Sequence, residues 1–331
     1  MFDLQIKKSV SFELPVVSVG NLSTGGTGKT PHVEYLVKLL NEKLRVGVMS
    51  RGYRRRTSGY FLVEENSTAA QTGDEPLQIK RKFPQATVAV CEERALGIPI
   101  MLIDEPELEV IVLDDAFQHR RLLPSLSILL TEYSCLFTRD HLLPAGNLRE
   151  QSHHASRADL IIITKCPEQL TSEEKSHLTN EVRKKQDQPV FFSSLKYIEA
   201  YDLFQPAKKI DLLRVDSAIL VTGIASSQGL LDHVRSKIRN VQHLKFGDHH
   251  SFTSHDVKLI AEKFRSLSTP AGIILTTEKD GVRLLPFRNF FESQQLEITC
   301  IPVEVLFSDP EKEKFDSFVW DSVERKLRES E

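Results

Sequence analysis

The chain has 331 residues and a mass of 37.6 kDa, more than one small hydrophobic core requires, and this length favours two domains of roughly 150 residues each. Hydrophobic residues make up 40% and charged residues 27%, a balance that excludes a largely disordered, collagen-like or coiled-coil protein. The formal net charge of -3 provides no global positive field, so no nucleic-acid partner is expected.

The four cysteines, Cys91, Cys135, Cys166 and Cys300, lie far apart in the sequence and show no C-x-x-C spacing. This pattern favours a reducing cytoplasm over a disulfide framework or a zinc site. No apolar run approaches the ~18 residues that a membrane span requires, and the opening residues lack the apolar core of a secretory signal. We therefore expect a chain that is neither exported nor membrane-spanning.

The first half of the chain alternates short β-branched runs with amphipathic segments, as repeated strand–helix–strand units do. Apolar residues recur at helical spacing between positions 33 and 44, and Pro31 suits a first helical turn. Together these patterns predict a buried parallel sheet. The predicted strands lie at 15–19, 46–49, 87–90, 110–113, 127–130 and 160–163.

A second alternating series follows, with a helix expected near 226–238 and a closing amphipathic helix at 311–331. The stretch 197–216 has poor periodicity and is expected to connect the two series. The sequence thus predicts a larger α/β domain over 1–196 and a smaller α/β lobe over 197–331. The strands of the second series are expected at 218–222, 241–246, 272–275 and 298–303.

The most informative segment runs from Pro15 to Pro31 and reads PVVSVGNLSTGGTGKTP. A predicted strand leads into closely spaced glycines, and these are followed by Lys29 and Thr30 at the start of a predicted helix. Glycines let backbone N–H groups converge on phosphate oxygens, while the lysine contacts the β- and γ-phosphates and the threonine hydroxyl binds Mg²⁺. The segment therefore predicts a binding loop for a nucleoside triphosphate.

The loop is a variant of the usual pattern. G-x-x-x-x-G-K-[ST] would place a glycine at Ser23, and the G-G-x-G-K-T form of switch ATPases carries a lysine at the position of Thr24. The second departure argues against a nucleotide switch. Guanine recognition by an N/T-K-x-D strand end would need an aspartate at Pro167, so adenine is favoured.

Two carboxylates end the predicted strand at 110–113, where the sequence VIVLDD supplies Asp114 and Asp115. The C-terminal ends of parallel strands face the ligand crevice of such a sheet. Asp114 is expected to hold Mg²⁺ directly or through water, and Asp115 to support the same metal shell. Gln118 and His119 follow at the same edge.

Phosphoryl transfer to an alcohol needs a base within reach of the hydroxyl. Asp74 lies in the segment GDEP before a predicted helix, where a role as helix cap explains it equally well. His249 and His250 lie in a turn before another predicted helix. The residues alone leave open whether any of these groups is catalytic.

Three further segments carry candidate polar groups. The basic, tyrosine-containing loop SRGYRRR at 50–56 is consistent with an anion site or with a solvated charge run. The loop HLLPAGNLRE at 141–150 offers Arg149 and Glu150. The segment TEKD at 277–280 follows a predicted strand, where helix capping competes with a ligand role.

Taken together, these segments resemble the tetraacyldisaccharide 4'-kinase family, the lipid A 4'-kinases. The motifs occur in the order VGNLSTGGTGKTP, SRGYRRR, GDEP, VLDDAFQHRRL, LLPAGNLRE, GDHHSFT and TEKD, between residues 15 and about 283. The resemblance implies an α/β fold with a P-loop NTPase-like parallel sheet flanked by helices, and a second, smaller α/β lobe. It also implies ATP-dependent phosphorylation of the 4'-hydroxyl of a tetraacylated glucosamine disaccharide 1-phosphate.

The resemblance also implies roles for individual residues, with ATP and Mg²⁺ as cofactors. Asp74 would be the base, paired with His249 or its rival His250, and Lys29 would contact the transferred phosphate. The implied nucleotide-binding residues are Asn21, Ser23, Thr24, Gly25, Gly26, Thr27, Gly28, Lys29 and Thr30. The implied metal ligands are Thr30, Asp114, Asp115 and Glu150. The implied substrate-binding residues are Arg51, Tyr53, Glu75, Gln118, His119 and Arg149.

Members of this family act at the cytoplasmic face of the bacterial inner membrane and usually carry an apolar amphipathic segment before the phosphate loop. Only 14 residues precede Pro15 here. We therefore expect weak peripheral membrane association, and a monomer.

Two other functions stay open at this point. A soluble kinase of a small sugar-like metabolite would use the same loop and base without a groove for acyl chains. A nucleotide-switch ATPase would need no acceptor, and Thr24 together with the Asp and His candidates argues against it.

Overall fold

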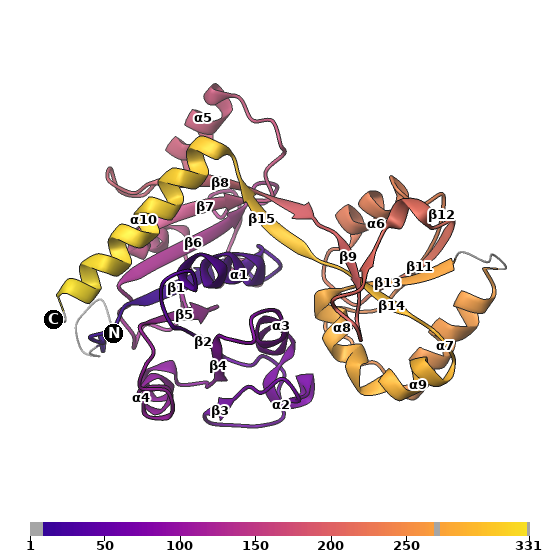
Figure 1. The fold of residues 1–331 in the computed structure, drawn as a ribbon. Helices are drawn as coiled ribbons and strands as arrows, with labels where there is room; N and C mark the ends of the chain where they lie inside the picture. Colours follow the sequence, from indigo (N-terminus) through magenta and orange to yellow (C-terminus); the bar gives the residue numbers. More distant parts are fainter. Residues whose placement is uncertain (1–8, 268–271, 330–331) are drawn as a thin grey trace.

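The computed structural model describes residues 9–267 and 272–329, which form two α/β lobes side by side (Figure 1). The larger lobe is built on a sheet of nine strands over these residues. In spatial order the strands are β15 (Val303–Phe307), β8 (Val190–Tyr197), β7 (Leu160–Thr164), β6 (Leu126–Glu132), β1 (Val16–Asn21), β5 (Val110–Asp114), β2 (Val46–Ser50), β4 (Thr87–Val90) and β3 (Phe61–Leu62).

Helices cover both faces of this sheet, so its central strands are apolar throughout, as buried parallel strands are. Alternate side chains of each strand contribute to a different hydrophobic cluster on each face. One face packs against α1 (Lys29–Leu40), α3 (Asp74–Lys82) and α10 (Asp309–Arg328). The other packs against α4 (Arg94–Asp104) and α5 (Ser172–Val182), while the short α2 (Ala69–Thr72) precedes α3.

The order of the parallel strands positions the phosphate loop. β1 lies in the middle of the sheet, with β5 and β6 as parallel neighbours, and β2 pairs with β5 on the far side. The loops after β1, β2 and β5 therefore emerge at one edge. The predicted α/β class with a P-loop-like parallel sheet is confirmed, and the six strands expected in the first half correspond to β1, β2, β4, β5, β6 and β7.

The second lobe has a six-stranded sheet over the described residues, with a parallel centre. Its strands in spatial order are β10 (Lys209–Ile210), β9 (Ala200–Asp202), β14 (Ile298–Ile301), β13 (Gly272–Thr277), β11 (Ser217–Thr222) and β12 (Asn240–Lys245). Its helices are α6 (Gln228–Arg235), α7 (Ser254–Arg265), α8 (Glu278–Leu284) and α9 (Arg288–Ser293). The connection expected at 197–216 contains β9, β10 and a short 3₁₀ turn at Leu212–Arg214.

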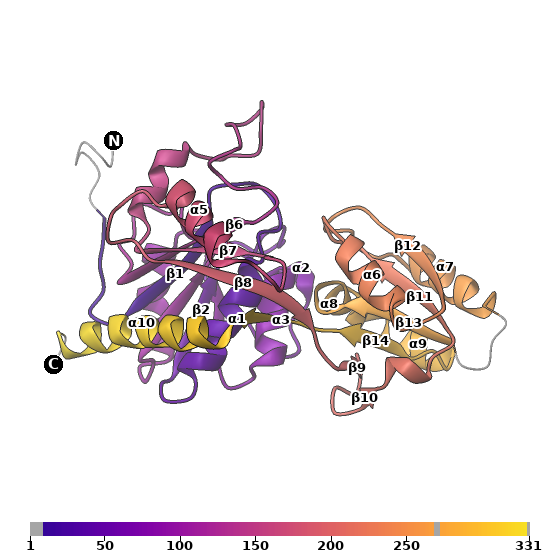
Figure 2. The same cartoon turned by 90° about the horizontal axis from the view of Figure 1, so that it is seen from above.

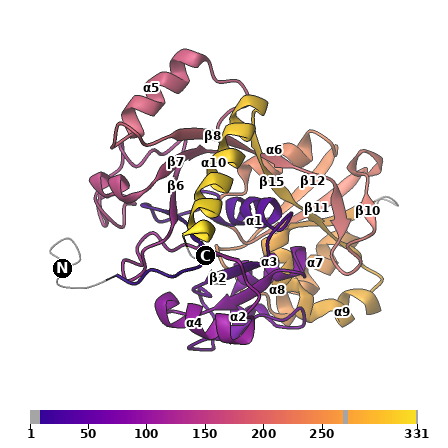
Figure 3. The same cartoon turned by 60° about the vertical axis from the view of Figure 1, so that its left-hand side comes forward.

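The last part of the chain differs from the predicted arrangement. The sequence pattern suggested one strand at 298–303, but Pro302 separates β14 of the second sheet from β15, which pairs antiparallel with β8 of the first sheet. Val305 and Phe307 are buried in the cluster that α10 covers, and α10 crosses the first lobe beside α1 (Figures 2 and 3). The division at 196 and 197 stays a prediction, but residues 303–328 lie with the first lobe and not with the second.

None of the helices within 9–267 and 272–329 combines the length and the apolar character that crossing a bilayer requires.

We expect Phe315→Ala to lower the free energy of unfolding of the first lobe by about 3–5 kcal/mol, because its buried ring contacts Tyr35, Phe191 and Phe307. The single tryptophan, Trp320, lies on the same helix, so its fluorescence in a urea titration reports unfolding of this lobe. The control Lys314→Ala removes an exposed side chain from α10 and should stay within about 0.5 kcal/mol of the parent. A shift for Phe315→Ala no larger than that of the control would contradict this packing.

Candidate functional site

The candidate site begins with the loop between β1 and α1. Gly28 caps α1 with φ of 84°, a left-handed conformation that glycine adopts without strain. Lys29 Nζ lies 3.3 Å from Asn21 Oδ1, and Asn21 Nδ2 donates to Thr27 Oγ1 over 3.0 Å. Thr164 Oγ1 donates to the Thr27 carbonyl at 2.9 Å, which fixes the loop to β7. These hydrogen bonds fix the loop to β1 and β7, while Gly25 and Gly26 are exposed.

The N-terminal end of α1 is suited to bind an anion. Its cap residue is a glycine that offers no side-chain acceptor, and the first turn carries no acidic residue. The first N–H groups of the helix therefore keep their capacity to bind phosphate oxygens, and the helix dipole adds to the attraction. A Cβ placed on Gly25 or Gly26 would meet no atom within 4 Å, so open space lies beside the loop.

A neighbouring loop braces the other side of the glycine-rich turn. Thr24 N donates to the Asn147 carbonyl at 2.7 Å, and Ser23 forms a β-bridge with Leu148. Arg149 N donates to the Leu22 carbonyl at 2.7 Å. The predicted nucleotide-binding residues therefore form one continuous segment that the 141–150 loop borders.

The two carboxylates after β5 have different surroundings. Asp114 is buried, and burial together with the charges of Asp115 and Glu75 raises its pKa to about 7. Burial alone would raise the pKa of Asp115 as well, but Lys29 and Arg149 lower it below its ordinary value. Arg149 contacts both oxygens of Asp115, at 2.9 and 3.3 Å, and Lys29 Nζ lies 3.7 Å away.

A divalent cation fits part of this residue set. Asp114 Oδ1 is buried, and it has no hydrogen-bond partner among the described residues, so an acceptor oxygen is left for a cation. Thr30, the other predicted protein ligand, is the second residue of α1 and directly follows Lys29. Within 9–267 and 272–329 no cluster of three or more His, Cys, Asp or Glu side chains forms a complete metal site, so phosphate oxygens and water would complete the shell.

Glu150, also a predicted metal ligand, lies in a separate ion-pair cluster. Its Oε2 is 2.8 Å from Arg157 Nη2 and 2.9 Å from His154 Nδ1. Its Oε1 is buried without a hydrogen-bond partner within the described part of the chain. One oxygen of Glu150 therefore contacts Arg157 and His154, and the other has no hydrogen-bond partner among the described residues.

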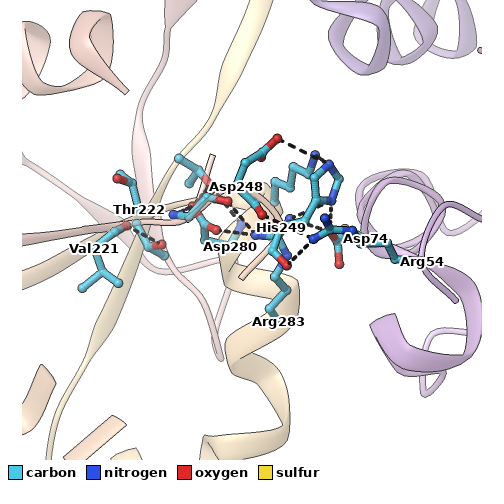
Figure 4. Close-up of polar contacts among 12 residues, drawn as sticks. Arg54, Asp74, Val221, Thr222, Asp248, His249, Asp280 and Arg283 are labelled. Atoms are coloured by element: carbon cyan, nitrogen blue, oxygen red, sulfur yellow. Dashed lines mark hydrogen bonds and ion pairs between the residues drawn. The ribbon is translucent and has the colours of Figure 1, made fainter. Parts of the chain in front are cut away.

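The second part of the site lies where the two lobes meet (Figure 4). Asp74, the first residue of α3, accepts a hydrogen bond from Arg283 Nη2 at 2.5 Å, and His249 Nδ1 lies 3.1 Å from the same oxygen. Asp74 belongs to the first lobe, whereas Arg283 and His249 belong to the second. His250 instead contacts Asp256 at 3.0 Å, so the structure brings His249 and not its neighbour to Asp74.

The charges around Asp74 keep it ionised. Burial alone would raise its pKa, but hydrogen bonds with His249 and Arg283 and the charges of Arg283 and Lys279 lower the pKa below its usual value. His249 has φ of 55°, a conformation that is uncommon for a non-glycine residue and that is found disproportionately at functional sites. The backbone of His249 therefore adopts an uncommon conformation at the position from which its side chain contacts Asp74.

A buried aspartate of the second lobe aims Arg283 at this position. Asp280 is fully buried and accepts hydrogen bonds from Gly223 N at 3.0 Å, from Thr277 Oγ1 at 2.8 Å and from Arg283 Nη1 at 2.8 Å. Arg283 Nη1 also donates to the Gly223 carbonyl at 2.9 Å (Figure 4). With one nitrogen of the guanidinium fixed in this way, the other points across the lobe boundary to Asp74.

The basic loop after β2 also crosses between the lobes. Arg54 Nη1 donates to the His249 carbonyl at 3.2 Å, and the Tyr53 ring meets the His249 ring edge-on at 5.1 Å between centroids. Glu75 forms an ion pair of 2.7 Å with Lys279, whose Nζ lies 3.2 Å from His249 Nε2. Tyr53 and Glu75, both predicted to bind substrate, thus border the Asp74–His249 pair.

The remaining predicted substrate residues lie at the edge of the first sheet. Gln118 Nε2 donates to the Asn21 carbonyl at 2.8 Å, and Gln118 Oε1 is buried without a partner among the described residues. Burial and the charges of Arg94, Arg121 and Arg51 lower the pKa of His119. Arg51 is exposed. This edge therefore carries several arginines around a neutral imidazole, as an anion site requires.

Three functional side chains were missed by sequence reasoning. Arg283 and Lys279 lie in or just after the TEKD segment, but nothing in the local spacing connects them with Asp74, 209 and 205 positions earlier. Arg94 is buried and donates to the carbonyls of Asp114 and Asp115 at 3.4 and 3.1 Å. No local pattern in the sequence points to Arg94, because its burial and its contacts with the end of β5 appear only in the structure.

Comparisons with known proteins show the family to which the chain belongs. The family model described as LpxK, tetraacyldisaccharide-1-P 4'-kinase, matches residues 1–324. A curated tetraacyldisaccharide 4'-kinase of Bacteroides thetaiotaomicron is 40% identical over 341 residues, covering 100% of this chain and 90% of the relative. One from Flavobacterium johnsoniae is 41% identical over 285 residues, covering 86% of this chain and 82% of the relative.

A solved structure gives the same result for the fold. The crystal structure of the "apo" form of LpxK from Aquifex aeolicus in complex with ATP superposes with a TM-score of 0.73 at 28% sequence identity. The match covers 97% of this chain and 92% of that protein. The two lobes and their order along the chain are therefore common to both proteins.

Proposed function

We infer the reaction from the premise that this chain belongs to the LpxK family of tetraacyldisaccharide 4'-kinases. It is a kinase that transfers the γ-phosphate of ATP to the 4'-hydroxyl of a tetraacylated disaccharide 1-phosphate in lipid A synthesis. The structural observation that supports this assignment most directly is the ionised Asp74 at the lobe boundary, held by His249 and Arg283. A nucleotide switch has no use for a base placed in this way.

We propose that the loop from Asn21 to Thr30 binds the triphosphate of ATP. Backbone N–H groups of the glycine-rich turn and of the first turn of α1 would bind the phosphate oxygens. Lys29 is now engaged by Asn21 and Asp115, and it would move its ammonium group toward the β- and γ-phosphates when ATP binds. Arg149 stays bound to both oxygens of Asp115 and would neutralise that carboxylate in the absence of Lys29.

Mg²⁺ is proposed as the cofactor, with Thr30 and Asp114 as its protein ligands. Asp114 fits this role because its unpartnered, buried oxygen is suited to a hard cation. Bound there, the ion would neutralise phosphate charge as the transfer proceeds. Asp115 and Glu150 are engaged by arginines and would act on the metal shell through hydrogen bonds.

In the proposed transfer, Asp74 accepts the proton of the 4'-hydroxyl as the sugar oxygen attacks the γ-phosphorus. The bond between that phosphorus and the β–γ bridging oxygen breaks, and ADP leaves with the electron pair. His249 contacts Asp74 and would orient it and share its proton. Arg283 keeps the carboxylate ionised before the reaction, and Lys279 and Glu75 bring the second lobe against the base.

The substrate-binding proposal rests on the groups that border the lobe boundary. Tyr53 is 55% exposed beside His249, so its ring is free to pack on a sugar. Arg51, with Gln118 and His119 at the same edge, would bind anionic and hydroxyl groups of the disaccharide. Peripheral association with the cytoplasmic face of the inner membrane and a monomeric state remain part of the proposal.

The function is tested by locating the new phosphate. The wild-type protein, incubated with γ-labelled ATP, Mg²⁺ and the tetraacyl disaccharide 1-phosphate, should place label on the 4'-oxygen. Lys29→Ala should lower kcat by at least about 100-fold because it removes charge from the transition state. Lys38→Ala removes an exposed lysine from the same helix and should leave kcat unchanged. Label on a simple sugar instead of the lipid, or no consumption of ATP, would contradict the assignment.

Asp74 and His249 should behave as a pair. Asp74→Ala and His249→Ala should each lower kcat, and the double variant should lose less than the product of the two, with a coupling of about 1 kcal/mol or more. The reason is the direct contact of 3.1 Å between the two side chains. His250→Ala is the matched control, since His250 contacts Asp256 instead. Losses that multiply without coupling would rule out the pair.

The pH dependence of kcat/KM should show the effect of Arg283 on the pKa of Asp74. The pKa of Asp74 lies below the ordinary pKa of an aspartate. Asp74 therefore stays ionised at a pH equal to that ordinary pKa, and activity is lost only at lower pH. Arg283→Met removes the lowering charge and leaves burial to raise the pKa, so the acidic limb of kcat/KM should move to higher pH. The control Arg288→Met removes an exposed arginine paired with Glu292. An unmoved acidic limb in Arg283→Met would exclude this electrostatic role.

A further inference from the structure

A second ionic contact crosses between the lobes, away from Asp74. Lys82, the last residue of α3, places Nζ 2.7 Å from Glu34 Oε2 and 3.1 Å from Glu278 Oε2. Glu34 lies on α1, one turn after Thr30, and Glu278 is the first residue of α8. One ammonium group therefore connects the helix of the phosphate loop, the helix of the base and a helix of the second lobe.

The packing of the three helices makes this connection central. α3 lies between α1 and α8, as Figures 1 and 2 show. At the N-terminal end of α3, Asp74 pairs with Arg283 and Glu75 pairs with Lys279. Both cations belong to α8. At the C-terminal end, Lys82 contacts Glu278 at the start of α8. The position and direction of α3 are therefore defined by ion pairs at both of its ends.

The contact is buried and its polar atoms are fully used. The side chains of Lys82, Glu34 and Glu278 are 20%, 5% and 8% exposed. The second oxygen of Glu34 accepts from Gln78 Nε2 at 2.7 Å, and the second oxygen of Glu278 accepts from Tyr201 OH at 3.2 Å. Buried ion pairs with satisfied partners define geometry more than they add stability, so such a cluster is suited to fixing a position.

The charge balance shows why Lys82 matters to this arrangement. Two carboxylates face one ammonium group, and burial together with the Glu278 charge raises the pKa of Glu34 to about 7 even beside Lys82. Without Lys82, burial and the Glu278 charge would raise the pKa of Glu34 further, so Glu34 would take up a proton and Glu278 would be left buried without its cation. The ammonium group that joins α1, α3 and α8 would be lost, and α3 would no longer be fixed to either neighbour.

We propose that Lys82 is a positioning residue, which holds Asp74 in register with the phosphate loop by fixing α3 against α1 and α8. The proposal rests on the kinase function proposed above, since it concerns the base of that reaction. Lys82 touches neither ATP-binding residues nor the Asp74 side chain in this structure, so it acts through the helix. It links the lobe boundary to the loop that binds the γ-phosphate.

The principal test is Lys82→Met. We expect kcat for the lipid to fall by about 10- to 100-fold, since displacements of about 1 Å in a reacting group have effects of this size. The KM for ATP should change less than about threefold because the contacts of Asn21, Thr27 and Lys29 do not involve Lys82. Lys82→Arg, which can bridge both carboxylates, should recover most of the activity.

A second variant separates positioning from stability. Lys82→Met/Glu278→Gln also removes the carboxylate that Lys82→Met leaves buried without a cation, so its resistance to urea should return toward that of the wild type while kcat stays low. Recovery of kcat together with stability would overturn the proposal. So would a kcat for Lys82→Met within about twofold of the wild type, or a loss expressed only as a higher KM for ATP.

Lobe separation supplies a measurement that does not depend on kinase activity. Cys135 is the one exposed cysteine of the four, and a spin label there can be paired with one on Lys258→Cys at an exposed position of α7. Electron–electron distance measurements should give a longer or broader distribution in Lys82→Met than in the parent. An unchanged distribution would overturn the proposal even if the lipid proved not to be the substrate.

The matched control is Lys175→Met. Lys175 forms a partly buried ion pair of 2.8 Å with Glu311, and this pair joins α5 to α10 within the first lobe. Its loss should leave kcat and the inter-lobe distance as in the parent. A fall in kcat equal to that of Lys82→Met would show a general effect of losing a partly buried ion pair and would overturn the proposal.

Discussion

The ion pair between Asp74 and Arg283 is the constraint on which the rest of the site depends. A carboxylate that is largely buried keeps its charge only when a cation faces it, and here the cation comes from the other lobe. Asp280 and Gly223 fix the direction of that cation, and His249 adopts a left-handed backbone conformation to join it. The contacts that keep Asp74, the proposed base, ionised therefore exist only in an arrangement that brings both lobes together.

The phosphate loop and the base come from different structural sources, and this division of labour is physical. The loop depends on local features: positive φ at glycine, a free helix N-terminus and a lysine next to them. The proposed base depends on the contact of α3 of the first lobe with α8 of the second. Binding of one substrate at the loop can therefore be coupled to formation of the site for the other.

The predictability of each part of the molecule follows from the range of the contacts that create it. Two parts of the site were predictable because the residues that bind phosphate and metal are adjacent in the sequence. These are the loop ending in Lys29 and Thr30 and the strand ending in Asp114 and Asp115. The Asp74–His249 pair came only from the family resemblance, and Arg283 was missed, because contacts over 175 and 209 positions leave no local pattern. A closing helix was expected at 311–331 and is found at Asp309–Arg328, but its place beside the first sheet was not predicted, because periodicity indicates an apolar face and not what it packs against.

The return of the chain to its first sheet has a consequence for the order in which the molecule is made. Tyr197 and Val303 are opposite each other in the ladder between β8 and β15, so everything between them is an insertion with adjacent ends. A ribosome therefore releases the complete inserted lobe while the larger sheet still lacks its edge strand and the helix that covers Phe191 and Phe307. Until the last segment emerges, the apolar surface of the first lobe that this segment covers stays exposed to solvent. The nascent chain must then bind a chaperone or fold rapidly to avoid aggregation.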